Sequence, residues 1–160
     1  LSNNLGNLIQ RVIKILNKNF NNEIPISLKE EVKENKHITK GYELKKSIDI
    51  KMNEFQVSKC LEDIFLYIDE LNKFMDDSEP WSTFKTKPEK AGKDLTILVE
   101  CFRIIGIILQ PFIPKAAKEI LDMLNIESSQ RYFSNLSNEF SIDKNHIINN
   151  PEQLFPRYEK

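Results

Sequence analysis

Four polar side chains that could bind a ligand recur at helical spacing near the start of the chain. They are Asn7, Arg11, Lys14 and Lys18, at steps of four, three and four residues. Residues three and four apart share one helix face, so these side chains form a single polar stripe. Residues 1–22 contain no acid that could neutralise it. An amide and three cations in a row could contact an anion or the edge of a base, although a solvated helix face is the plainer interpretation.

A fifth candidate is Trp81, the only tryptophan in the chain. It follows Pro80 just after a strongly helical segment and lies beside acidic and polar residues, whereas a core tryptophan is usually embedded in an apolar run. An indole presented at a helix exit could stack on a flat ring. It could also close the end of a helical bundle, because large aromatic side chains often do so.

The elements that must position these residues are predicted to be helices, which makes the fold class an all-α helical bundle. Apolar residues recur every three or four positions over 2–18, 38–52, 54–77, 88–109 and 115–124. Ser27 with Glu30 indicates the start of a further short helix through a capping box. The helix over 88–109 is apolar nearly all round, so it should be the central one.

Three side-chain environments also follow from the pattern. The apolar stripe of the helix over 54–77 includes Phe55, Val57 and Phe65 and is expected to be buried. Arg103 interrupts the apolar run of the central helix, so we expect it to pair with an acid of a neighbouring helix. His37 stands among charged residues and is expected on the surface.

The chain divides into a helical bundle over 1–124 and a C-terminal extension over 125–160. The extension is rich in Asn and Ser and ends in an apolar, aromatic tail over 154–158. Because a free tail would not need such residues, we expect the extension to pack back on the bundle. The chain opens without methionine and within a helical pattern, so we interpret it as a piece of a larger protein.

Charge and motifs restrict the function. The formal net charge of −1 provides no global field for nucleic acid, so any positive site must be local. Positive charge concentrates in residues 1–22 and 81–94, and the acids between them, in 56–80, should repel phosphates. The glycines form no phosphate-binding loop, and neither histidine has catalytic partners at recognisable spacing. These features favour a binding module over an enzyme.

The two cysteines, Cys60 and Cys101, lie far apart within apolar helical patterns. They show no disulfide or metal-ligand spacing, so we expect buried free thiols in a reducing cytosol. No signal peptide or membrane-spanning apolar run is visible, and no membrane partner is expected.

Four motifs, in order, resemble the anticodon-binding domain of bacterial-type methionyl-tRNA synthetase, a class I aminoacyl-tRNA synthetase. They are Asn4-Leu5-Gly6-Asn7-Leu8-x-x-Arg11-Val12, Asn72-Lys73-x-x-x-Asp76-x-x-x-Pro80-Trp81, Ile107-x-x-x-Pro111-Phe112-Ile113-Pro114 and Leu154-Phe155-Pro156-Arg157. The resemblance covers essentially the whole chain, with only general similarity over 19–56. One departure is Glu79, because the family usually has a small or neutral residue before Pro-Trp.

The resemblance implies a helical bundle that recognises the CAU anticodon of the methionine tRNA. In that family an Asn and an Arg four residues apart, with the Trp of the Pro-Trp turn, read the anticodon, and these roles fall on Asn7, Arg11 and Trp81. Lys14 and Lys18 are candidates for contacts with the RNA backbone.

For this fragment the resemblance implies no catalytic residue and no cofactor. ATP and Mg²⁺ would bind a missing catalytic core before Leu1, because its signature sequences are absent here. The parent protein, in the cytoplasm, would use ATP to ligate methionine to its tRNA.

Two alternatives remain open. The chain could be a helical protein–protein interaction module in which Trp81 is the anchor. It could also be the anticodon-binding domain of another class I synthetase. Anticodon binding should weaken steeply with salt, whereas a tryptophan-anchored protein contact should not. Only the identity of the tRNA would separate the two synthetases.

Overall fold

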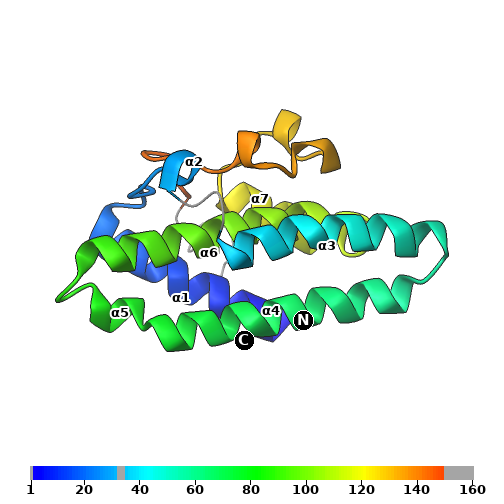
Figure 1. Cartoon of the computed structure of the whole chain (residues 1–160). Coiled ribbons are helices and arrows are strands. Elements are labelled where there is room, and N and C mark those ends of the chain that lie inside the picture. Colours follow the sequence, from blue (N-terminus) through cyan, green and yellow to red (C-terminus); the bar gives the residue numbers. More distant parts are fainter. Residues whose placement is uncertain (1, 32–34, 150–160) are drawn as a thin grey trace, which may run out of the picture.

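A computed structural model describes residues 2–31 and 35–149, whose helices pack side by side as a bundle (Figure 1). The helices are α1 (Ser2–Phe20), α2 (Leu28–Glu31), α3 (Lys36–Asn53), α4 (Val57–Ser78), α5 (Pro80–Thr83), α6 (Pro88–Leu109) and α7 (Pro114–Met123). Three 3₁₀ turns follow, Ser128–Gln130, Phe133–Asn135 and Asn138–Phe140. Within the described ranges the only β pairing is an isolated bridge between Glu23 and Ile147. The predicted all-α class is confirmed.

Helix α6 is the centre of the bundle. Every residue from 94 to 109 is buried, and α1, α3, α4, α5 and α7 all pack against this helix. The contact with α7 is especially close at Gly106, where a Cβ atom would lie 2.8 Å from Leu121 Cδ2. Glycine is therefore required by packing there rather than by backbone conformation. The prediction that this helix is central is confirmed.

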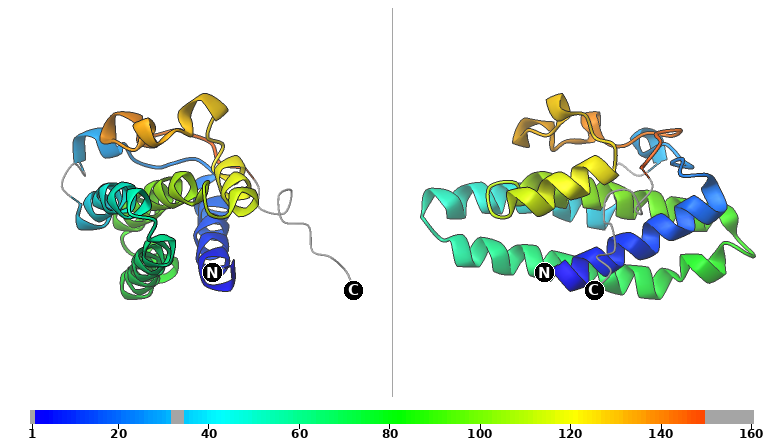
Figure 2. Two further views of the ribbon diagram at one scale, coloured as in Figure 1. Left: turned by 90° about the vertical axis from the view of Figure 1, so that its right-hand side faces the viewer. Right: turned by 180° about the vertical axis from the view of Figure 1, so that it is seen from behind.

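Helices α3 and α4 form a hairpin that projects beyond the start of α1 (Figure 2). Helix α4 begins at Val57, three residues later than predicted, because Phe55 takes a left-handed conformation (φ 59°) that ends α3. Phe55 is 92% exposed, and Val57 and Phe65 are exposed as well. Their predicted burial is therefore wrong. An apolar stripe is buried only where another element covers it, and α1 does not reach this end of α4.

The predicted partner of Arg103 is also wrong. Arg103 is buried and pairs with Glu100 of its own helix, with Nη2 donating to Oε1 over 2.6 Å. Residues three apart share a helix face, so the two side chains enter the core together. A buried ion pair needs its remaining polar atoms satisfied. Arg103 donates to the Asn135 carbonyl, and Glu100 accepts from the Tyr42 hydroxyl and the Ile142 N–H.

These bonds attach part of the segment after α7 to the centre of the bundle. Two backbone bonds add to them, because the Ile24 N–H donates to the His146 carbonyl and the Asn145 N–H donates to the Ile24 carbonyl. The division at 124 and the packing of the whole extension over 125–160 stay predictions. The tail motif over 154–157 lies outside the described residues.

Two further expectations concern single side chains. Cys60 and Cys101 are buried free thiols, as predicted, and burial raises the pKa of Cys101 to about 12. His37 is only half-exposed, with its ring 4.4 Å from that of Phe74, which corrects the simple surface interpretation. Burial against α4 lowers the pKa of His37.

No helix in the described ranges is both long enough and apolar enough to cross a membrane. The same residues contain no group of three His, Cys, Asp or Glu side chains that could hold a metal ion.

Candidate nucleic-acid interface on α1, α4 and α5

Helix α1 lies parallel to the C-terminal half of α4, and matching side chains bond the two helices. Asn4 Nδ2 donates to Asp69 Oδ1 over 3.0 Å, and Arg11 Nη2 donates to Asp76 Oδ1 over 3.1 Å. Asn72 Nδ2 donates back to Asn4 Oδ1 over 3.0 Å. The bonded residues are seven apart on each helix, so the two helices stay in register over two turns.

The pairing of Arg11 with Asp76 corrects the expectation that no acid neutralises the stripe on α1. The two side chains are 42% and 64% exposed, respectively. An exposed ion pair of this kind contributes only about 0–1 kcal/mol to stability. A ligand could therefore replace Asp76 as the partner of the Arg11 guanidinium at a small cost in free energy. Sequence reasoning missed Asp76, although the shared spacing of seven, in Asn4 with Arg11 and in Asp69 with Asp76, was a usable signal.

Trp81 is held at the exit of α4 by a sharp turn. Glu79 ends α4 in the left-handed conformation (φ 46°), and the buried Pro80 then starts α5. Thr83 Oγ1 donates to the Ser78 carbonyl over 2.9 Å, which fixes α5 against the end of α4. The Trp81 indole stays 41% exposed, so the predicted presentation at a helix exit is confirmed.

A second anchor lies directly after α5. The ring of Phe84 meets that of Phe20, at the end of α1, edge to face with centroids 5.4 Å apart. The chain on both sides of Trp81 is thus fixed to the bundle, through Pro80 before it and Phe84 after it. A flat ring held in this way loses little conformational freedom when it binds a ligand.

Arg11 joins the two sequence features into one surface. Its guanidinium carbon lies 5.3 Å from the centroid of the Trp81 ring, within the range of a cation–π contact. Asn7 is exposed one turn before Arg11, and Lys14 and Lys18 are exposed further along α1. We call Asn7, Arg11, Asp76 and Trp81 the Arg11–Trp81 surface. Its amide, guanidinium and indole suit recognition of a flat ring with polar edges, while the Asp76 carboxylate is the partner of Arg11 in the free protein.

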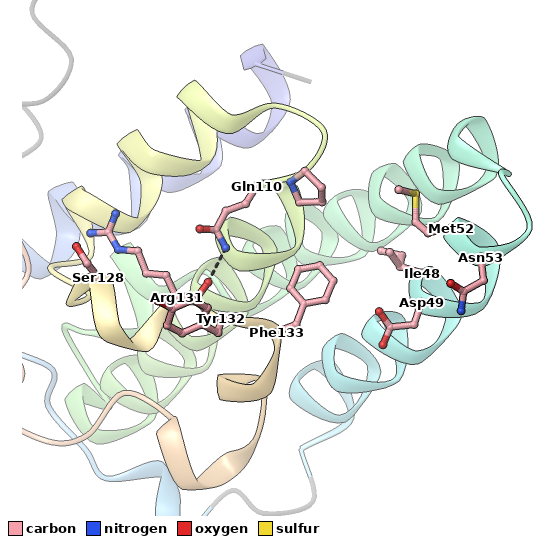
Figure 3. A pocket seen from close by; sticks show the side chains of 10 residues that line it. Ile48, Asp49, Met52, Asn53, Gln110, Ser128, Arg131, Tyr132 and Phe133 are labelled. Carbon is pink, nitrogen blue, oxygen red and sulfur yellow. Dashed lines mark hydrogen bonds between the residues drawn. The ribbon is translucent and has the colours of Figure 1, made fainter.

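Two cavities among the described residues lie away from this surface. One of about 960 Å³ lies between the end of α3 and the first 3₁₀ turns, where Gln110 Nε2 donates to the Arg131 carbonyl (Figure 3). Another of about 780 Å³ lies between α3, α4 and α6 and is lined by several lysines. Neither includes a residue of the Arg11–Trp81 surface.

Comparison with known proteins relates this chain to methionyl-tRNA ligases. The sequence model of the anticodon binding domain of methionyl tRNA ligase matches residues 24–160. A methionine–tRNA ligase of Rickettsia bellii is 34% identical over 169 residues, covering 100% of this chain and 32% of that protein. The corresponding ligase of Rickettsia felis is 32% identical over 162 residues, covering 99% of this chain and 32% of that protein. Asn7 and Arg11 precede the matched family model but lie within these longer alignments.

Comparison with solved structures points to the same family as the sequence comparisons. The apo form of Mycobacterium tuberculosis methionyl-tRNA synthetase superposes with a TM-score of 0.88 at 25% identity, over 100% of this chain and 33% of that one. The chain spans about a third of the length of the curated relatives it matches. On the strength of the family match and these relatives, the chain belongs to the family of anticodon-binding domains of methionyl-tRNA ligases.

Proposed function

We propose that this chain binds tRNA and reads the CAU anticodon of the methionine tRNA through Asn7, Arg11 and Trp81. The observation that carries the proposal is the 5.3 Å contact between Arg11 and Trp81, which unites the polar stripe of α1 with the exposed indole. Membership of a family of anticodon-binding domains supports the proposal that the anticodon binds this surface. Lys14 and Lys18 are further candidates, for contacts with the RNA backbone.

The chemistry of the surface fits an unpaired RNA loop. Stacking of a base on an aromatic side chain contributes ~1–3 kcal/mol, and it needs bases that are already unstacked. Stacking does not distinguish bases, so selectivity must come from hydrogen bonds to base edges. The Asn7 amide both donates and accepts, whereas the Arg11 guanidinium only donates. Lys14 and Lys18 would add a salt-dependent contribution through phosphate contacts.

We propose further that the longer protein carrying this chain is a cytoplasmic enzyme that ligates methionine to this tRNA with ATP. ATP and Mg²⁺ would bind the remaining part of that protein. Relatives named methionine–tRNA ligase support this, as does the similarity to Mycobacterium tuberculosis methionyl-tRNA synthetase in complex with methionyl-adenylate. The structure of that complex has a TM-score of 0.87 at 25% identity.

The decisive experiment follows Trp81 fluorescence during titration with an anticodon stem-loop that carries CAU. Because Trp81 is the only tryptophan, any change in the signal reports on the proposed surface. We expect quenching with CAU, a much weaker response when the first anticodon base is changed, and loss of binding in Arg11→Ala. Lys59→Ala is the matched control, because Lys59 is an exposed cation outside this surface.

Two results would contradict the proposal in different ways. Equal quenching by both loops would leave RNA stacking but remove anticodon specificity. No response to either loop at low salt, from a folded sample, would remove RNA binding. In that case Trp81 would be better explained as an anchor for a protein partner.

A further inference from the structure

One face of α4 is covered by α1 along only part of its length. At steps of four, four, three and four residues, this face carries Leu61, Phe65, Asp69, Asn72 and Asp76. Helix α1 bonds to the face from Asp69 onward, because Asn4, near the start of α1, is the partner of Asp69. Leu61 and Phe65 continue the same face beyond the point where α1 begins. This part of α4 and its turn from α3 project past α1 (Figure 2).

The uncovered end of the hairpin is unusually apolar. In the parts of the chain that the structure describes, nine large hydrophobic side chains are exposed, and six of them lie between 50 and 66. The six are Ile50 (61%), Met52 (36%), Phe55 (92%), Val57 (45%), Phe65 (39%) and Leu66 (61%). Single exposed apolar residues are ordinary, but a group of this size in one region marks an interaction site.

We propose that the segment immediately preceding Leu1 in the longer parent protein docks on the N-terminal half of α4, over Val57, Leu61 and Phe65. The relatives are about three times as long as this chain, so a large part of the parent lies outside it. Helix α1 begins at Ser2, beside the covered part of the face. Because α1 runs parallel to α4, the residues that precede α1 in the parent would lie next to the uncovered part. The proposal rests on family membership and is independent of anticodon reading.

The charges of this region argue for an apolar protein segment over RNA. Between 57 and 66 the only cation is Lys59, against the two acids Glu62 and Asp63. A nucleic acid would find no phosphate contacts there beyond one lysine. An apolar segment, in contrast, would gain from burying the exposed Phe65 ring and Val57 side chain, because the driving force is proportional to the apolar area removed from water.

Thiol labelling of Ser58→Cys tests the proposal. Ser58 is exposed and lies seven residues before Phe65, on the same face, and serine to cysteine changes size little. The native thiols Cys60 and Cys101 are buried and stay unreactive toward a maleimide. We expect labelling at Ser58→Cys to be about tenfold slower in the longer parent than in the 160-residue chain. Lys59→Cys, exposed on another face, should react equally fast in both.

A second variant shows whether the apolar contact causes the protection. Phe65→Ser, added to Ser58→Cys in the parent, should restore fast labelling, while Lys59→Cys stays unchanged. Equal labelling of Ser58→Cys in the parent and in the 160-residue chain would overturn the proposal. So would protection that survives Phe65→Ser, protection that appears only with tRNA, or protection of the 160-residue chain that grows with its concentration and thus identifies a second copy.

Discussion

The two halves of α4 differ sharply although they belong to one helix and share one face. In the half from 69 to 78 the face is polar, is bonded to α1 through Asp69 and Asp76, and ends next to the exposed indole of Trp81. In the half from 57 to 66 the same face carries Leu61 and Phe65, and no helix within residues 2–31 and 35–149 lies over it. The covering element, and not the apolar content of the helix, decides which residues are buried.

The turns at the two ends of α4 are alike in one respect. Phe55 before the helix and Glu79 after it both take positive φ angles, 59° and 46°, without being glycine. Each turn carries an exposed aromatic side chain, which is Phe55 before α4 and Trp81 after Glu79. Residues in strained conformations cluster at functional sites. An exposed aromatic ring at each end of α4 fits the two partners we propose, protein at one end and RNA at the other.

The largest expected effect compares two leucines of α4. Leu71 is fully buried, whereas Leu66 is 61% exposed. Leu71→Ala should lower the free energy of unfolding by about 2–5 kcal/mol, because it leaves a cavity in the core. Leu66→Ala in the same 160-residue chain should change it by less than about 0.5 kcal/mol. Urea unfolding followed by circular dichroism measures both, and a large loss for Leu66→Ala would show that its end of α4 is already covered.

The next effect is on RNA binding. Trp81→Ala should weaken binding of a labelled CAU stem-loop by roughly 1–3 kcal/mol, because one stacking platform is lost. Phe65→Ser, at the other half of the helix, should leave the affinity unchanged. Fluorescence anisotropy of the labelled RNA measures both variants. A loss of affinity in Phe65→Ser equal to that in Trp81→Ala would mean that the two halves do not serve separate partners.

A smaller effect tests the turn before α4. Phe55 closes α3 by donating its N–H to the Met52 carbonyl, while Gln56 donates to the Lys51 carbonyl. This helix-ending motif favours Gly or Asn at its left-handed position. Phe55→Asn should therefore raise the free energy of unfolding of the 160-residue chain by about 0.5–1 kcal/mol.

Asn125 supplies the matched position for that test. It ends α7 with φ 56°, donating its N–H to the Asp122 carbonyl. Asn125→Phe should destabilise the chain for two reasons. The substitution replaces a residue that favours the left-handed conformation, and it removes the hydrogen bond from Asn125 Nδ2 to the Ile147 carbonyl. A destabilising Phe55→Asn would instead assign the exposed Phe55 ring a packing role within this chain.

The smallest effect concerns Asp76, on the covered half of α4. Asp76→Asn should change stability by less than about 1 kcal/mol, because the pair with Arg11 is exposed. It should strengthen binding of the CAU loop and of a changed loop alike, since a carboxylate that repels phosphates and occupies Arg11 is removed. The gain should shrink as salt rises. Titrations of both loops at two salt concentrations check this, and weaker binding would indicate that Asp76 itself contacts the RNA.

Much of the architecture could be predicted from periodicity, because a helix is specified by residues three and four apart. The spans of α1, α6 and α7, the central position of α6 and the exposed stripe with Asn7 and Arg11 all followed from the sequence. So did the presentation of Trp81, because a proline turn after a helix is a local signal. The four motifs also placed the chain in its family, which the relatives then confirmed.

Pairing and coverage were decided only by tertiary structure. The shared spacing of seven was not enough by itself to place Asp76 beside Arg11, because 65 residues separate them and the contact depends on α1 lying parallel to α4. The sequence could not show that Arg103 would meet Glu100, since burial and the backbone of the later segment make that pair stable. It also misjudged Phe65, whose exposure depends on where α1 begins. Local spacing determines which side chains share a face, and only the neighbouring elements determine what that face meets.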